Sequence, residues 1–119
     1  MSSLMLKRVY ERPEPGDGTR ILVDRLWPRG LSRAKIDVWL KDIAPSDQLR
    51  KRFHAKPGDW DAFCAAYAAE LEGEPAQAAL EHLRELQHTG PVTLLYAARD
   101  EAHNNAVALK AWLELRRPS

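Results

Sequence analysis

Cysteine is scarce in this chain, and long apolar runs are missing. The single cysteine, Cys64, excludes an internal disulfide and a zinc site with several cysteine ligands. No stretch reaches the roughly 18 apolar residues of a membrane-spanning helix, and the opening residues MSSLMLKRVYERPEP lack the apolar run of a signal peptide. We therefore expect the 119 residues to form one soluble, cytoplasmic domain without membrane contact.

The common motifs of phosphate binding, hydrolysis and metal binding are also missing. The sequence contains no G-x-x-x-x-G-K-[ST], no G-x-G-x-x-G, no G-x-S-x-G and no H-E-x-x-H. Its histidines are scattered without the spacing of metal ligands: His54, His82, His88 and His103. We therefore expect no metal ion and no cofactor.

The net charge is close to zero, so it favours no class of partner. Its distribution is uneven, because residues 25–56 hold nine Lys or Arg against three Asp, whereas residues 57–90 hold one Arg against seven acids. The two segments thus carry net charges of +6 and −6. This asymmetry is typical of a basic face that attracts anions, of two solvated faces, or of opposite faces that pair in a homodimer.

The chain alternates apolar strand segments with amphipathic helices. Strands are predicted at residues 4–10, 20–24 and 91–97, the last without polar alternation, so that both of its faces should be covered. Helices are predicted to begin near Ser46, Trp60, Pro75 and Asp100, with Asp100 as the N-cap of the last. Residues 11–19 are a loop because they hold two prolines and two glycines, and residues 37–45 fit a strand or a helix.

This order of elements predicts a single α/β domain with its core at about residues 4–115. Several helices separate the strands at 20–24 and 91–97, which is long enough for a crossover, so these two strands should be parallel. The link from the first strand to the second is short, and the direction of the first strand stays open. The expected architecture is a small, mostly parallel, Rossmann-like sheet flanked by helices.

Polar side chains follow two of the strands. Ligands of open parallel sheets bind beyond the carboxyl ends of the strands. The segments DRLWPRG and YAARDEAHNN should meet there, and they supply Asp24, Arg25, Trp27, Arg29, Tyr96, Arg99, Asp100, His103, Asn104 and Asn105. Arginine binds two oxygens of one anion, and the last helix adds its N-terminus, so the pattern predicts a pocket for phosphate, carboxylate or a nucleotide. Asp24 or His103 would move a proton in any reaction there.

Several of these residues also have a structural interpretation. Arg25 also fits a structural ion pair with a nearby acid, and helix capping alone explains Asp100. Trp27 and Trp39 fit packing positions as well as ligand contacts. Cys64 lies on the apolar stripe of a helix, where thiols are buried and unreactive.

The motifs VDRLWPRGLS, WLKDIAPS, LRKRF and PVTLLYAARDEAHNNAVALK resemble the YeaO-like branch of the domain of unknown function 488 (DUF488) family, in order over roughly residues 4–115. The resemblance implies a compact bacterial α/β domain and no settled activity. In the broader family, Cys-His-Arg opens the final helix. Here His103 is kept without the cysteine, Asn104 stands near the arginine position, and Tyr96 replaces a frequent cysteine. These departures weaken a thiol-based mechanism and leave an anion pocket intact.

Three functions are consistent with the sequence. The first is an enzyme or sensor that binds a small phosphorylated or nucleotide-like ligand, with Arg25, Arg29 and Arg99 on the anion. The second is a nucleic-acid-binding module, in which the basic segment 25–56 combines phosphate contacts with stacking on its aromatic residues. The third is a non-catalytic protein that pairs its basic face with the acidic helices of a second copy.

Overall fold

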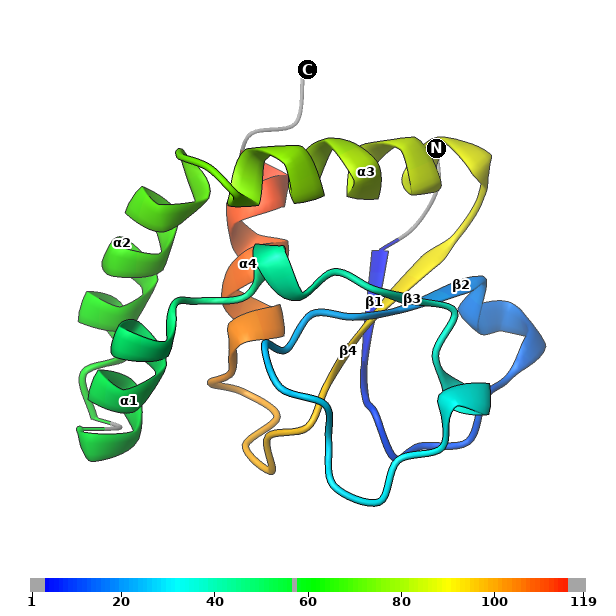
Figure 1. Ribbon diagram of the computed structural model, residues 1–119, viewed down its shortest axis with the longest axis horizontal. Helices are drawn as coiled ribbons and strands as arrows, with labels where there is room; N and C mark the ends of the chain where they lie inside the picture. Colours follow the sequence, from blue (N-terminus) through cyan, green and yellow to red (C-terminus); the bar gives the residue numbers. More distant parts are fainter. Residues whose placement is uncertain (1–3, 57, 116–119) are drawn as a thin grey trace.

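The computed structural model describes residues 4–56 and 58–115, which form a four-stranded sheet and four α-helices (Figure 1). The strands are β1 (Leu4–Arg8), β2 (Thr19–Leu22), β3 (Val38–Trp39) and β4 (Val92–Tyr96). The helices are α1 (Asp47–Ala55), α2 (Trp60–Leu71), α3 (Ala76–Thr89) and α4 (Asn105–Leu115). Three short 3-10 helices lie in the connections: η1 (Pro15–Asp17), η2 (Arg33–Lys35) and η3 (Lys41–Ile43). The predicted α/β class is confirmed.

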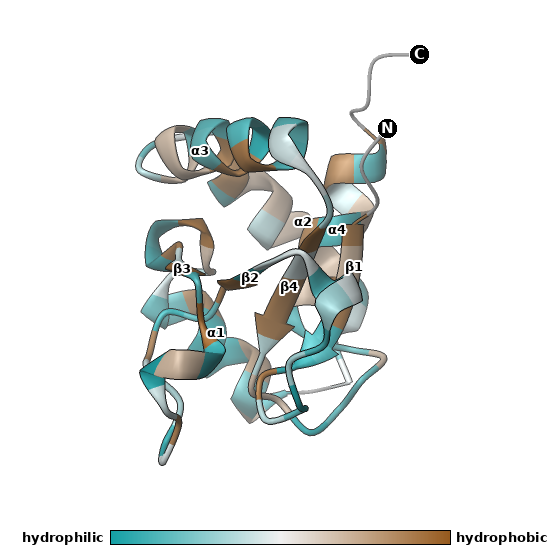
Figure 2. Cartoon of the chain, turned by 90° about the vertical axis from the view of Figure 1, so that its right-hand side faces the viewer, coloured by the Kyte–Doolittle hydropathy of each residue, from teal (hydrophilic) through white to brown (hydrophobic). Residues whose placement is uncertain are grey.

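The sheet is parallel throughout, in the order β1-β4-β2-β3. Leu94 in the central strand pairs with Leu6 of β1 on one side and with Ile21 of β2 on the other. Every residue of β4 is buried, which explains its apolar sequence without alternation, and β4 is mostly brown in Figure 2. The parallel pairing predicted for the second and last apolar strands is confirmed, and the open direction of the first strand is parallel as well.

Residues 37–45, which fitted a strand or a helix, contain a little of both. Val38 and Trp39 pair with Ile21 and Leu22 and form the edge strand β3. The chain then turns into η3, whose Ile43 is fully buried. Two ladder residues are all that this segment contributes, because it leaves the sheet as soon as Leu40 has donated its N–H to Leu22.

Within the described residues, the α-helices pack on one face of the sheet. Strand side chains alternate between faces, and those facing the helices are Ile21, Val23, Val92, Leu94 and Tyr96, which share one hydrophobic cluster with residues of α1 to α4. Leu22 and Leu95 point to the opposite face and form a second cluster with Val9. Residues of the loops, Trp27, Leu31 and Ile36, pack on that second cluster. Loops 9–18 and 24–37 therefore replace a second helical layer.

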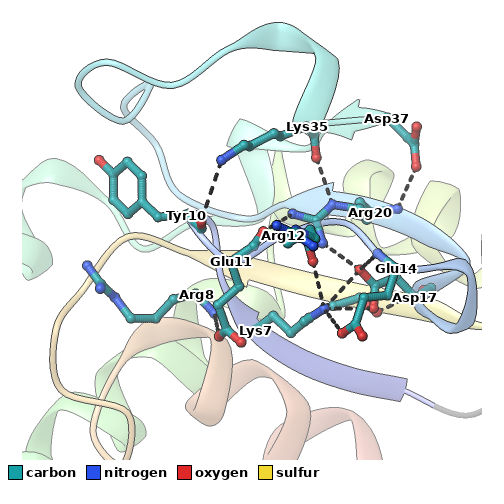
Figure 3. Close-up of polar contacts among 11 residues, drawn as sticks. Lys7, Arg8, Tyr10, Glu11, Arg12, Glu14, Asp17, Arg20, Lys35 and Asp37 are labelled. Atoms are coloured by element: carbon teal, nitrogen blue, oxygen red, sulfur yellow. Dashed lines mark hydrogen bonds and ion pairs between the residues drawn. The ribbon is translucent and has the colours of Figure 1, made fainter.

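A group of charged side chains around the buried Asp17 fastens the loop between β1 and β2 to the sheet (Figure 3). Asp17 pairs with Arg20 and lies 3.0 Å from Lys7 Nζ, which is also 2.9 Å from Glu14. The hydroxyl of Thr93 donates to the backbone carbonyl of Asp17 at 2.8 Å. Lys7, Arg20 and Thr93 belong to β1, β2 and β4, so a single loop residue is bound to three strands. We call Lys7, Glu14, Asp17 and Arg20 the Asp17 cluster.

Arg20 also binds the second loop on this face. Its Nε donates to the carbonyl of Lys35 at 2.8 Å, and its Nη2 donates to the carbonyl of Glu11 at 3.2 Å. Its backbone N–H donates to Asp37 at 2.9 Å. Loop carbonyls that lie against a sheet need donors, because an unpaired buried polar group costs about 1–3 kcal/mol. The guanidinium of Arg20 supplies these donors to both loops.

The charged form of Asp17 is favoured in the folded protein. Burial raises the pKa of this carboxyl, but hydrogen bonds from Lys7, the Glu14 backbone and Arg20 outweigh burial and hold its pKa below the ordinary value. The Asp17 contacts therefore stabilise the fold above the ordinary carboxyl pKa. This contribution is lost as the pH falls through the lowered pKa of the folded state.

The described residues contain no helix with the length and apolar character that a membrane span requires.

Asp17→Asn should lower the free energy of unfolding by about 2–3 kcal/mol, because it leaves Arg20 buried without its counter-charge. Glu14→Gln is the matched control, since Glu14 binds the same Lys7 from an exposed position and should cost less than about 1 kcal/mol. Urea denaturation measures both values. Equal losses in the two variants would show that burial of the Asp17 cluster contributes no stability.

Gly18→Ala should destabilise the protein by more than about 2 kcal/mol. Gly18 has a φ of 64°, and a Cβ atom at this position would lie 2.1 Å from the carbonyl oxygen of Pro91. Gly16→Ala is the control, because no heavy atom lies within 4 Å of its Cβ position, and it should change stability by less than about 0.5 kcal/mol. Thermal unfolding of both variants tests the difference, and a Gly18→Ala protein as stable as Gly16→Ala would contradict it.

Candidate functional site

The carboxyl ends of β2 and β4 open into a cavity of about 350 Å³. The two strands end side by side, with Leu22 paired to Leu95 and the N–H of Val23 bonded to the Leu95 carbonyl. The loops after both strands, the start of α4 and one side of α1 surround the cavity. Its polar lining residues are Asp24, Arg25, Arg50, His54, His103, Asn104 and Asn105, and its aromatic ones are Trp27, Phe53 and Phe63.

Asp24 joins the three elements that meet at the cavity. Its Oδ2 accepts the backbone N–H of Ala97 at 2.9 Å, and its Oδ1 accepts from Asn105 Nδ2 at 3.1 Å. The same amide of Asn105 donates to the carbonyl of Val23 at 2.9 Å. Burial raises the pKa of Asp24, against the two hydrogen bonds, which lower it. Both oxygens of Asp24 therefore act as hydrogen-bond acceptors in the folded protein.

Arg25 holds one wall of the cavity in place. Its Nε donates to the carbonyl of Pro45 at 3.1 Å, and its Nη2 donates to the carbonyl of Ala44 at 3.2 Å. These bonds tie the loop after β2 to the segment between η3 and α1. The guanidinium of Arg25 thus donates to backbone carbonyls, and it forms no ion pair with an acid among the described residues.

Helix α1 supplies three lining residues that were absent from the predicted set. Arg50, Phe53 and His54 fall on one side of the helix at the spacing i, i+3 and i+4. Ser46 caps the helix by accepting from Leu49 N at 3.2 Å, as predicted, and donates its hydroxyl to Glu70 of α2. The spacing indicates in the sequence that these three residues share one side of a helix. It does not indicate that this side faces the carboxyl ends of the strands.

The Nε atom of Arg50 is buried and has no hydrogen-bond partner in residues 4–56 and 58–115. The only contact that its guanidinium makes with an acid in this part of the chain is a 3.4 Å approach to Asp47, which is largely exposed. A buried N–H without a partner is unusual in a folded protein, and the side chain that carries it lines the cavity. Arg50 is therefore the lining cation with an open donor.

His103 lies on the aromatic residues of α2. Its ring centroid is 4.8 Å from that of Trp60 at an interplanar angle of 30°, and its Nδ1 is 3.9 Å from Asp100. Asp100 accepts the N–H groups of Ala102 and His103, and these two hydrogen bonds lower its pKa. The segment before α4 is thus a turn closed by the Asp100 carboxylate.

The prediction that Asp100 caps the last helix is wrong. Helix α4 begins at Asn105, and its cap is Asn104, whose Oδ1 accepts from Val107 N at 2.9 Å. Asn104 also donates to the Asp100 carbonyl at 2.9 Å. Asp and Asn are comparable N-caps, and the sequence offers both within one turn. Asp100 closes the turn that precedes the helix, which leaves Asn104 to start it.

The cavity brings together most, but not all, of the predicted site residues. It is lined by Asp24, Arg25, Trp27, His103, Asn104 and Asn105. Four predicted residues lie outside its lining: Arg29, Tyr96, Arg99 and Asp100. Arg29 and Arg99 are exposed, and Tyr96 is buried in the cluster on the helical face, where burial raises the pKa of its phenol. The anion contacts predicted for Arg29 and Arg99 therefore have no support from the lining of the cavity.

The aromatic residues of the basic segment contact neighbouring side chains. The guanidinium of Arg33 lies 5.8 Å from the ring of Trp27, and the ammonium of Lys41 lies 5.7 Å from the ring of Trp39. The two indoles pack edge to face at 5.3 Å. Faces that already carry a cation are less available for stacking with bases, so this arrangement does not favour the nucleic-acid function, which stays a prediction.

Two further expectations concern chemistry. Cys64 is half-buried against the main hydrophobic cluster, and burial with the nearby Asp61 raises its pKa, which suits packing more than reactivity. No group of three or more His, Cys, Asp or Glu in the described residues is arranged to hold a metal ion.

Arg25→Met should lower the free energy of unfolding by about 1–3 kcal/mol, because the carbonyls of Ala44 and Pro45 lose their donors. Arg29→Met, an exposed neighbour in the same loop, should change it by less than about 0.5 kcal/mol. Urea denaturation of the two variants compares them. An Arg25→Met protein of wild-type stability would show that Arg25 is not a structural residue.

Comparisons with known proteins agree on one family. Residues 3–117 match the family described as the inactive DUF488-N3 subclade. The chain is 42% identical over 113 residues to the uncharacterised protein YeaO of Escherichia coli K12, covering 93% of this chain and 96% of that protein. It is 41% identical over 104 residues to the uncharacterised protein Rv3073c of Mycobacterium tuberculosis H37Rv, covering 86% of each. No solved structure matches. The chain therefore belongs to the DUF488 family, among its YeaO-like members.

Proposed function

We propose that this protein binds a small organic anion in the cavity beyond β2 and β4 and does so without chemical turnover. The observation that carries the proposal is Arg50, whose side chain lines the cavity and whose buried Nε has no hydrogen-bond partner in the described residues. Leaving such a donor unpaired costs about 1–3 kcal/mol, and a bound anionic oxygen removes this cost once a turn of the side chain brings the Nε–H to it. Anion binding is thus favoured, because the free protein already carries the free-energy cost of this unpaired N–H.

The two arginines of the lining differ in their hydrogen-bond partners, and this difference supports the same proposal. Arg25 is engaged with two carbonyls, whereas Arg50 combines its open donor with a weak contact to Asp47. Arginine presents its donors as a planar fork that matches phosphate or carboxylate oxygens. Arg50 would therefore bind the anion, and Arg25 would keep the wall on which the ligand rests.

Absence of turnover is supported by the residues that surround the cavity. The described lining contains no Ser, Thr, Cys, Tyr or Lys, so its side-chain nucleophiles are limited to Asp24, His54 and His103. Asp24 is held by Ala97 and Asn105, and His103 packs on Trp60 beside Asp100. The description of the matching family as inactive agrees with a binding or sensing role.

Arg50→Gln should weaken the binding of phosphate-bearing ligands by about 10-fold or more, because a hydrogen bond to a charged group is worth about 1.5–3 kcal/mol. The probes are inorganic phosphate, ribose 5-phosphate and nucleoside monophosphates in a thermal-shift titration at fixed ionic strength. A ligand at about 100 Kd stabilises the native state by about 2.7 kcal/mol, which is a readable shift. The protein should remain folded, since Arg50 makes only a peripheral ion pair.

Lys51→Gln is the matched control, because it removes the same charge from the next, exposed position of α1. If both substitutions weaken binding equally, the effect comes from the net charge of α1 and not from Arg50. If no phosphate ligand raises the unfolding temperature of the wild-type protein, the proposal is overturned. A short single-stranded oligonucleotide is included in the panel, and a shift from it alone, steeply dependent on salt, would favour the nucleic-acid module instead.

A further inference from the structure

Resting on the anion-binding role proposed above, we infer that the ligand is a mononucleotide whose base presents two adjacent N–H donors to Asp24 while its phosphate binds Arg50. Two groups of opposite charge line one cavity: a carboxylate beyond the end of β2 and a guanidinium on α1. A simple anion satisfies only the second. A ligand with donors at one end and an anionic group at the other satisfies both.

Asp24 has capacity for more hydrogen bonds than the protein supplies. A carboxylate offers about four lone-pair positions on its two oxygens. Ala97 N–H and Asn105 Nδ2 each occupy one position, on different oxygens. Each oxygen thus keeps a lone-pair position that none of the described hydrogen bonds fills, Asp24 lines the cavity, and a pair of parallel N–H groups matches the two oxygens as a pair. Burial makes such donors valuable, because the desolvated carboxylate gains more from each bond.

The remaining lining selects a flat ring over a sugar. Phe53 and Phe63 line the cavity from α1 and α2, and they are the walls for a planar ring, because Trp27, which lines it from the loop after β2, already packs against Arg33 and Trp39. Aromatic walls stabilise a planar heterocycle by stacking or edge contacts, which a hydroxylated sugar cannot make as well. Of the common bases, guanine carries a ring N–H beside an exocyclic amino group, hypoxanthine carries the ring N–H alone, and adenine places an acceptor at that ring position.

The size of the cavity limits the ligand to one nucleotide. Its volume of about 350 Å³ lies at the small end of the roughly 300–1,000 Å³ range of ligand sites. One base with its sugar and phosphate suits this volume, whereas a dinucleotide or an oligonucleotide would extend outside. The negative charge of Asp24 also fixes the orientation, because it repels a phosphate from the strand end and leaves the phosphate to Arg50.

The test is a series of ligands on the unaltered protein: GMP, IMP, AMP and ribose 5-phosphate, titrated by calorimetry at constant ionic strength. GMP should bind about 10-fold more tightly than IMP, and AMP and ribose 5-phosphate should bind about 10-fold more weakly again, because each missing donor leaves a buried acceptor unpaired. Equal affinities for all four would overturn the base contact and leave the anion site standing. No binding by any of them would overturn both proposals.

Asp24→Asn provides the second measurement. It replaces one acceptor by a donor, so the preference for GMP over AMP should fall at least 10-fold, while the affinity for ribose 5-phosphate should not fall, because the charge that repels phosphate is removed. Retention of the full preference would exclude Asp24 as the contact. Because Asp24 also binds Ala97 and Asn105, thermal unfolding of the variant is recorded alongside. If the variant does not fold, the ligand series on the unaltered protein decides the question.

Discussion

The buried pairing of Asp17 with Arg20 makes it possible for this sheet to have helices on one face only. A parallel sheet buries both faces, and its usual cover is a helix in each crossover. Here the crossover from β1 to β2 is the loop 9–18, which carries only the short η1. Asp17 binds a side chain from each of three strands, and Arg20 bonds carbonyls from both covering loops. Ionic and hydrogen-bonded contacts do here what helix packing does elsewhere.

At the carboxyl end of the same strands, the polar residues that look catalytic in the sequence mostly hold the loops together. Asp24, Asn105 and Arg25 connect β2 to β4, to α4 and to the segment before α1. What is left for a ligand is the unused capacity of these groups and the open donor of Arg50. The protein contacts thus fix these charged groups independently of any ligand.

The sequence was sufficient to predict what depends on local pattern. The apolar segments 20–24 and 91–97 indicated parallel neighbours, and the rule for parallel sheets placed Asp24 near His103 and Asn105. The contribution of α1 could not be predicted, because the direction in which Arg50 points depends on how α1 packs against α2 through Ser46 and Glu70. The choice between Asp100 and Asn104 as cap was equally beyond local pattern, since both are good N-caps one turn apart.

The Asp17 cluster has a signal in the sequence. Arg20 and Thr93 are polar residues in otherwise apolar strands, and their alternation with Ile21 and Leu94 places them on the face away from the helices.

The order of the strands has a consequence for synthesis on the ribosome. β4, the last strand to be made, lies between β1 and β2 and is the sole partner of β1 within the described residues. The first strand must therefore wait, unpaired, until residues 92–96 emerge, and the sheet cannot close before that point.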